Sequence, residues 1–234
     1  MDKQVKKELS KRRDSTKAKL LQRYFKTNKG QYGEGDVFLG ITVPKQREVA
    51  KKFYKEISLA GLQKLLRNKI HEYRLTALLM LVDKYKKASE KEQKQIVEFY
   101  LKNTNWINNW DLVDLSAVRI LGSYLMDKPK NILYKLAHSQ SLWERRIAVL
   151  STFEFIRNQQ YEDTLKIATI LLHDKHDLIQ KAVGWLLREV GKKHLQTELS
   201  FLNKHYKTMP RTTLRYAIER LTPKQRLFYL NKKF

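Results

Sequence analysis

Three stretches of the chain, Arg74-Leu-Thr-Ala77-Leu-Leu79, Arg145-Arg-Ile-Ala148-Val-Leu150 and Leu214-Arg-Tyr-Ala217-Ile-Glu219, each place one small alanine inside an apolar run of helical spacing. Ala117 and Ala182 stand in comparable settings, so that successive alanines are separated by 40, 31, 34 and 35 residues. A period of this length holds two helices and two short turns, as in HEAT, armadillo or TPR arrays. The sequence therefore predicts an all-α solenoid of antiparallel helix pairs with HEAT-like repeats.

Between these marked helices lie segments of the right length to be their partners. We expect helices over residues 59–67, 90–102, 130–138, 161–173 and 194–206. Ser58 stands directly before the first of them, and Ser89 is followed three residues later by Glu92, which is the pattern of a capping box. These start signals support the division into helix pairs.

Glycine and proline are scarce, with 8 and 4 residues among 234, whereas β and α/β folds need frequent turns. Residues 2–25 are predicted to form a basic N-terminal helical segment. The stretch 27–40 contains four glycines and is predicted to be a loop, and Pro44 suits the first turn of the next helix. We expect a single domain over 1–234, with residues 1–43 as its N-terminal segment and Gly-rich connector.

The charge balance points to a polyanionic partner. Lys and Arg number 48 against 24 Asp and Glu, which gives a net charge of +24, and the 42% hydrophobic content is too high for a disordered basic tail. Nucleic acid is favoured over a membrane, since no apolar run approaches the length of a membrane span. The absence of cysteine excludes disulfides, thiolate metal sites and cysteine nucleophiles, and it suits a cytoplasmic location. We expect a monomer.

One helix of each pair should line a concave basic groove. Arg74, Asp114 and Arg145 each precede the alanine of their repeat by three residues, so they are predicted to lie at equivalent points along this groove. The alternative is that they cap helices or pair with neighbouring repeats.

The densest motif is Asn103-Thr-Asn-Trp-Ile-Asn-Asn-Trp110-Asp-Leu-Val-Asp114. Trp110 and Asp114 are four residues apart, so on a helix they share a face and together suit a cation. Trp185 follows Gly184, whose missing side chain lets a backbone or a ligand approach closely. The alternative for both tryptophans is core packing, and for Asp114 an ion pair between helices.

Other patterns are weaker. Arg145 and Arg146 offer forked donors suited to phosphate, although surface ion pairs of arginine are common. His173 and His176 with their neighbouring aspartates are poor evidence for a metal, and the chain has no phosphate-binding loop and no zinc-protease or hydrolase-elbow motif. We expect no metal and no cofactor.

Longer strings carry a resemblance to a known family. Trp-Asp-Leu-Val-Asp at 110–114, the stretch 142–150 and the stretch 179–189, extended by 38–44 and 209–219, resemble the AlkD-type DNA alkylation repair family. The match runs in order from about residue 23 onward. It implies a solenoid that acts as a monofunctional glycosylase on N-alkylated purines in duplex DNA, such as 3-methyladenine and 7-methylguanine, in base excision repair.

The resemblance also implies site residues. The family's catalytic aspartate and its two flanking tryptophans correspond to Asp114, Trp110 and Trp185, and its DNA-contacting arginine corresponds to Arg146. Tyr24 matches a tyrosine near the lesion on a shorter string. Arg145 and Lys181 are two further residues that we expect to bind DNA.

The implied chemistry suits these side chains. Alkylation makes the purine a cationic and good leaving group, so a carboxylate that stabilises the sugar cation and aims water at C1′ is sufficient. Two rival hypotheses remain: a non-catalytic binder of damaged or branched DNA, which needs only the basic groove, and a binder of acidic protein segments. Neither needs an aspartate between two tryptophans. The connector 26–37 is longer than in some members of the family.

Overall fold

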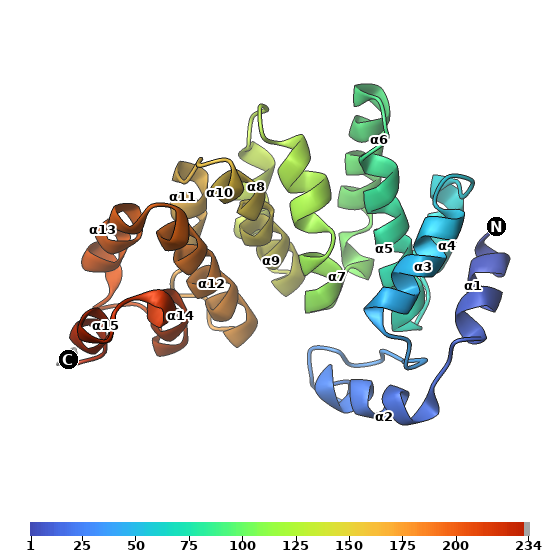
Figure 1. Cartoon of the computed structure of the whole chain (residues 1–234), viewed down its shortest axis with the longest axis horizontal. Helices are drawn as coiled ribbons and strands as arrows, with labels where there is room; N and C mark the ends of the chain where they lie inside the picture. Colours follow the sequence, from blue (N-terminus) through green and yellow to red (C-terminus); the bar gives the residue numbers. More distant parts are fainter. Residues whose placement is uncertain (232–234) are drawn as a thin grey trace. The chain divides into compact units, whose positions relative to one another are not determined.

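The computed structural model describes residues 1–231, which fold into α-helices joined by turns and by one longer connector, residues 25–42 (Figure 1). The helices are α1 (Asp2–Ser10), α2 (Ser15–Tyr24), α3 (Val43–Phe53), α4 (Leu59–Leu66), α5 (His71–Tyr85), α6 (Glu90–Lys102), α7 (Trp110–Asp114), α8 (Asn131–Ala137), α9 (Leu142–Ser151), α10 (Phe153–Arg157), α11 (Glu162–Ile170), α12 (Asp177–Lys193), α13 (Leu195–His205), α14 (Arg211–Ala217) and α15 (Pro223–Leu230). Short 3-10 turns cover Thr104–Trp106 and Ile218–Arg220, and a π-helical turn covers Val118–Gly122. These residues contain no β-strand, only an isolated bridge between Val37 and Ile70. The all-α prediction is confirmed.

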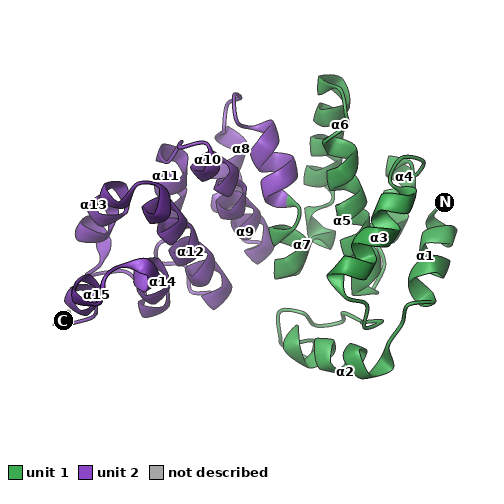
Figure 2. Ribbon diagram, in the orientation of Figure 1, with its two compact units in different colours: residues 1–116 green, residues 117–234 purple. Residues whose placement is uncertain are grey.

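The chain divides into two compact units, residues Met1–Ser116 and Ala117–Phe234 (Figure 2). In the first unit α5 is the central helix, because α1, α3, α4, α6 and α7 all pack against it. In the second unit α12 has this place, packed against α9, α13 and α14. That the whole chain is one domain stays a prediction.

The helix starts follow the expected capping chemistry. The Ser89 backbone N–H donates to the Glu92 carboxylate over 2.8 Å, which completes the predicted capping box of α6. Ser58 accepts the Gly61 N–H at 3.2 Å before α4, and Pro44 lies in the first turn of α3. The predicted partner helices are thus confirmed to within a few residues at each end.

The five marker alanines all lie in the core, with at most 1% of their surface exposed. Small buried side chains let neighbouring helices approach closely, and Gly184 shows the same effect. A Cβ at Gly184 would stand 2.4 Å from the Thr213 carbonyl oxygen, so only glycine permits the close contact of α12 with α14. The packing interpretation of Gly184 is therefore confirmed.

The basic segment 2–25 is helical as predicted. It is divided into two helices, α1 and α2, because Asp14 leaves the helical conformation and its carboxylate caps α2 by accepting the Lys17 N–H at 3.0 Å. The marked helix around Ala117 is also interrupted, since α7 ends at Asp114 and a π-helical turn begins at Val118.

Candidate functional site

The first unit contains a cavity of about 430 Å³ that gathers three of the predicted site residues, Tyr24, Trp110 and Asp114. Its walls come from α2, from the chain between Phe38 and Val43, and from the first turns of α5 and α7. The expectation that Trp110 and Asp114 share one face is confirmed, since both line this cavity. Leu20 and Leu115 contribute apolar surface.

Aromatic rings form one wall of the cavity. Trp110 stacks on Phe25 with centroids 4.9 Å apart and planes 6° from parallel, and Phe25 stacks in turn on Phe38 at 5.0 Å. Tyr24 meets Trp110 edge to face at 5.9 Å and is 65% exposed. One face of the Trp110 indole is thus fixed by packing, while Tyr24 borders the cavity on the solvent side.

Asp114 is the last residue of α7 and is half-buried. It lies close to the fully buried Tyr100, whose hydroxyl is 2.9 Å from the Ser116 hydroxyl. Burial raises the pKa of Tyr100, the hydrogen bond with Ser116 acts in the opposite direction, and the charge of Asp114 adds to the rise. Tyr100 is therefore a neutral phenol next to the candidate catalytic carboxylate.

Beside the aromatic wall, His71 lies between two carboxylates. Its Nδ1 is 3.0 Å from Asp36 Oδ2 and its Nε2 is 2.8 Å from Asp111 Oδ2. Arg74 forms an ion pair with the other oxygen of Asp36 and donates a hydrogen bond to Asn108. We call His71, Asp36, Asp111 and Arg74 the His71 cluster; all four residues are at most 6% exposed.

The charges of the cluster determine its protonation. Burial alone would lower the pKa of His71, but the charge of Asp111 and the hydrogen bonds to both carboxylates raise it to about 9. For Asp36, burial acts to raise the pKa, and the hydrogen bond from His71 with the charge of Arg74 outweighs it, so that the pKa is lowered. At neutral pH the cluster consists of two cations and two carboxylates.

A neighbouring carboxylate, Glu72, fixes the chain that forms another part of the cavity wall. Its oxygens accept the backbone N–H groups of Leu39 at 2.9 Å, Gly40 at 2.8 Å and Ile41 at 3.2 Å. Gly40 has φ +84°, and a Cβ there would stand 2.0 Å from the Asp14 carbonyl oxygen. Residues 39–41 are therefore held by α5 on one side and by the start of α2 on the other.

The other predicted site residues belong to the second unit. Trp185 on α12 is half-buried, donates from Nε1 to Glu189 at 3.1 Å and lies against the Phe153 ring. Arg146 on α9 is only 6% exposed and donates to the Leu178 carbonyl oxygen at 2.6 Å.

The two remaining cations of this set make ion pairs. Arg145 Nε donates to Asp174 at 2.6 Å, and Lys181 contacts Asp177 at 2.8 Å. Arg145 and Arg74, both predicted to line a groove, thus follow the alternative in which such residues pair with neighbouring segments.

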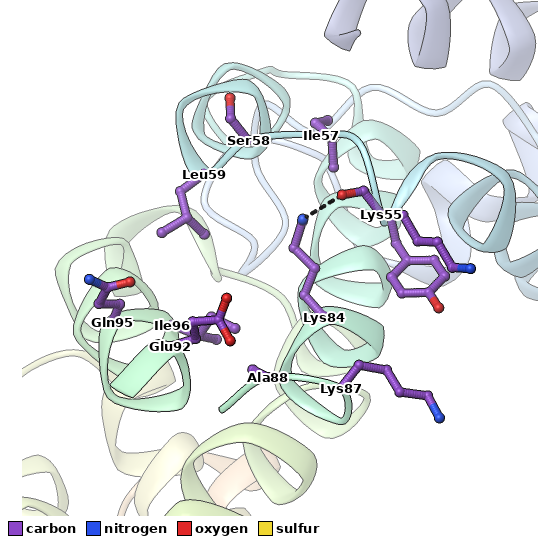
Figure 3. A pocket seen from close by; sticks show the side chains of 11 residues that line it. Lys55, Ile57, Ser58, Leu59, Lys84, Lys87, Ala88, Glu92, Gln95 and Ile96 are labelled. Carbon is purple, nitrogen blue, oxygen red and sulfur yellow. Dashed lines mark hydrogen bonds between the residues drawn. The ribbon is translucent and has the colours of Figure 1, made fainter. Parts of the chain in front are cut away.

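A second cavity of the first unit, about 560 Å³, is bordered by Ser58 and Leu59 at the start of α4, by Lys84 of α5 and by Glu92 of α6 (Figure 3). The Lys84 ammonium donates to the Lys55 carbonyl oxygen at 3.2 Å. Glu92 belongs to the capping box of α6. Both charged groups thus have structural partners, and none of the predicted site residues reaches this cavity.

Residues 1–231 bring together no group of three or more His, Cys, Asp or Glu side chains placed to hold a metal ion. Among the same residues, no helix combines the length and the apolar character that a membrane span requires.

Sequence reasoning missed Phe25, Asp36 and His71, and it did not connect Arg74 with Asp111. Asp111 lies inside the motif that was singled out, but a lone histidine and an aspartate in a glycine-rich connector give no periodic signal. Only the fold brings Asp36, His71 and Asp111 together, across 35 and 40 positions of the chain.

Comparison with known proteins places these observations in a family. The model of a family described as "DNA alkylation repair enzyme" matches residues 5–221. The chain is similar to a solved structure described as a predicted DNA alkylation repair enzyme from Enterococcus faecalis, with 18% identity, a TM-score of 0.70, and coverage of 91% of this chain and 98% of that one.

Two solved structures from Streptococcus mutans are also similar. AlkD2 has 15% identity and a TM-score of 0.57, over 88% of this chain and 98% of that one. The protein smu.31 of strain UA159 has 16% identity and a TM-score of 0.57, over 77% of this chain and 93% of that one. At these identities the likeness concerns the fold. No curated protein matches the chain.

Proposed function

The chain belongs to the DNA alkylation repair enzyme family, and on that basis we propose that it is a monofunctional glycosylase that excises N-alkylated, cationic purines such as 3-methyladenine and 7-methylguanine from duplex DNA. The observation that carries the proposal is the shared cavity of Trp110, Asp114 and Tyr24. An acidic side chain beside aromatic rings suits a substrate that is cationic before the reaction and develops positive charge on its sugar during it.

The reaction is a hydrolysis at C1′ of the deoxyribose. The bond from C1′ to the purine nitrogen breaks and its electron pair leaves with the base, which thereby loses its positive charge. Water adds to C1′ and gives up a proton, so the products are the free alkylpurine and an abasic site. Because the leaving group is already activated, no general acid is needed to expel it.

In this mechanism Asp114 stabilises the sugar cation electrostatically and orients the water. Trp110 and Trp185 attract the cationic nucleotide through their ring faces, and Tyr24 lies at the exposed edge of the cavity near the lesion. Arg146, Arg145 and Lys181 contact the DNA backbone.

The deciding experiment is release of the damaged base. Methylated duplex DNA is incubated with the protein in excess, and free 3-methyladenine and 7-methylguanine are quantified by chromatography against DNA without protein. We expect release of at least one of them together with abasic sites. Tight binding without release would show a non-catalytic DNA binder, and neither binding nor release would favour an acidic protein as partner.

A further inference from the structure

The helix that carries Trp110 and Asp114 is too short to hold its own position. α7 has five residues, about one turn, and isolated helices of that length are unstable because nucleation costs more than the few hydrogen bonds return. Something outside α7 must fix the direction of its side chains.

Both residues that flank Trp110 are bound to the His71 cluster. On one side, Asn109 caps the helix by accepting the Trp110 N–H at 2.8 Å while its amide donates to Asp36 at 3.2 Å. On the other side, Asp111 accepts a hydrogen bond from His71 at 2.8 Å. The start of α7 is therefore attached to His71 and Asp36 through the side chains of the two residues on either side of Trp110.

The attachment needs a charged histidine. A neutral imidazole has one N–H donor, whereas the carboxylates at Nδ1 and Nε2 are both acceptors, so only the imidazolium satisfies both. The ring is 1% exposed and stacks on Phe38 with centroids 4.5 Å apart. A buried imidazolium in this position is stable only while both carboxylates remain charged.

We propose that His71 is a positioning residue of the excision site: as an imidazolium bridging Asp36 and Asp111, it fixes the start of α7 and so directs Trp110 and Asp114 into the cavity. The inference rests on the proposed function, because it assigns a purpose to the residues of that site. His71 itself makes no contact with the reacting atoms in this proposal.

Charged groups face His71 from the connector, from α7 and from its own helix. Asp36 faces it from the connector, Asp111 from α7, and Arg74 from the next turn of α5, where its guanidinium pairs with Asp36. Glu72, next in the chain, directs its carboxylate to the backbone of 39–41. Loss of one proton from His71 would leave two carboxylates and one cation in the cluster, and one of the two carboxylates would lose the ring N–H that it accepts.

A first test observes the ring directly. Nitrogen NMR of labelled protein distinguishes an imidazolium from a neutral ring, and the His71→Gln variant assigns the signals. We expect both ring nitrogens of His71 to be protonated at pH 7 and the indole signal of Trp110 to move in His71→Gln. A neutral ring at pH 7, or an unmoved Trp110 signal, would overturn the proposal whether or not the protein excises bases.

A second test uses kinetics. His71→Gln should lower the single-turnover excision rate about tenfold or more, because small displacements of catalytic groups are costly, while affinity for undamaged duplex stays within about twofold. The double variant His71→Gln, Asp111→Asn removes one charge of each sign and should recover part of the rate.

The matched control is Leu65→Ala, a fully buried core change on α4 away from the cavity. At a temperature where both variants are folded, Leu65→Ala should keep the wild-type rate. If His71→Gln also keeps it, or if the double variant is no better than the single one, the inference fails while the proposed function stands. A wild-type protein that releases no base would instead refute the proposed function, and the NMR test would still decide whether His71 fixes α7.

Discussion

Asp114 and Trp110 meet at one cavity because a single helical turn separates them, and the same turn places Asp111 toward the buried histidine. One short motif thus supplies both a side chain for chemistry and a side chain for anchoring. The two aspartates of Trp110-Asp-Leu-Val-Asp114 should consequently respond differently to substitution.

Asp114→Asn is expected to remove most excision, by about 100-fold or more, while folding and DNA affinity stay nearly unchanged. The reason is that its negative charge is needed chiefly in the transition state. Single-turnover kinetics, with thermal unfolding as a control for folding, measure this effect. Cleavage at the wild-type rate would make Asp114 a structural residue.

The family resemblance implies that Arg146 contacts DNA, whereas in the structure its side chain is buried and donates to a backbone carbonyl. Its bond to the Leu178 carbonyl joins α9 to α12, so Arg146→Ala should lower the melting temperature, equivalent to about 1–3 kcal/mol for an unpaired buried group. If it also grips a phosphate, the folded fraction should lose DNA affinity and excision, and Lys at this position should restore only part of them.

Arg145→Ala is the control for Arg146, since Arg145 forms an ion pair with Asp174 and points about 100° away around the helix. It is expected to affect stability with a milder effect on affinity. Unchanged affinity in folded Arg146→Ala would reject the phosphate contact.

At the scale of elements, the start of a helix could be predicted from the sequence wherever a few adjacent residues determine it. The capping box of α6 needs only Ser89 and Glu92, and both are visible in the sequence. The break between α1 and α2 was not predictable, because Asp14 is fixed by a bond from its N–H to the Leu39 carbonyl, 25 residues ahead. The His71 cluster escaped prediction for the same reason: its partners meet only through the packing of α5, α7 and the connector.

The contact of α12 with α13 contains a buried carboxylate and offers a test of pH dependence. Glu198 on α13 is 2% exposed, and its Oε1 has no hydrogen-bond partner within residues 1–231. Burial raises the pKa of Glu198 to about 8, although the charge of Arg188 acts against the rise. The folded protein therefore holds this proton at a pH where the unfolded chain, with a pKa near 4.5, has lost it.

It follows that the contribution of Glu198 to stability is present below about pH 4.5 and is lost as the pH rises to about 8. Glu198→Gln keeps the shape without the charge, so it should be more stable than wild type at pH 9 and nearly equal to it at pH 5. Thermal unfolding across this range measures the difference. His71 is common to both proteins, so its own titration cancels. Parallel curves for wild type and variant would show that Glu198 is not buried as an uncharged acid.

At the scale of the whole molecule, the five buried alanines reflect how the helices pack, and the net charge of +24 reflects the kind of partner that the protein binds. The alanine period predicted the helix pairs because close packing demands small residues at regular intervals. The charge carries no information about the fold, and it points to the partner instead.

DNA binding should be strongly salt-dependent and nearly independent of sequence, because lysines and arginines that contact phosphates release counterions. We expect the logarithm of the dissociation constant for undamaged duplex to rise linearly with the logarithm of sodium chloride concentration. Fluorescence anisotropy with two duplexes of unrelated sequence measures it. An affinity that stays flat between low and physiological salt would contradict binding dominated by phosphate contacts.

The hydrogen bond from Asn109 to Asp36 spans 73 positions of the chain, whereas most helices pack against close neighbours in sequence. Bringing together residues so far apart in the chain costs conformational entropy before their contacts form, so this part of the molecule should form late during folding. During refolding the helical signal should accordingly return before excision activity does, because the site is complete only when the start of α7 is attached to the connector.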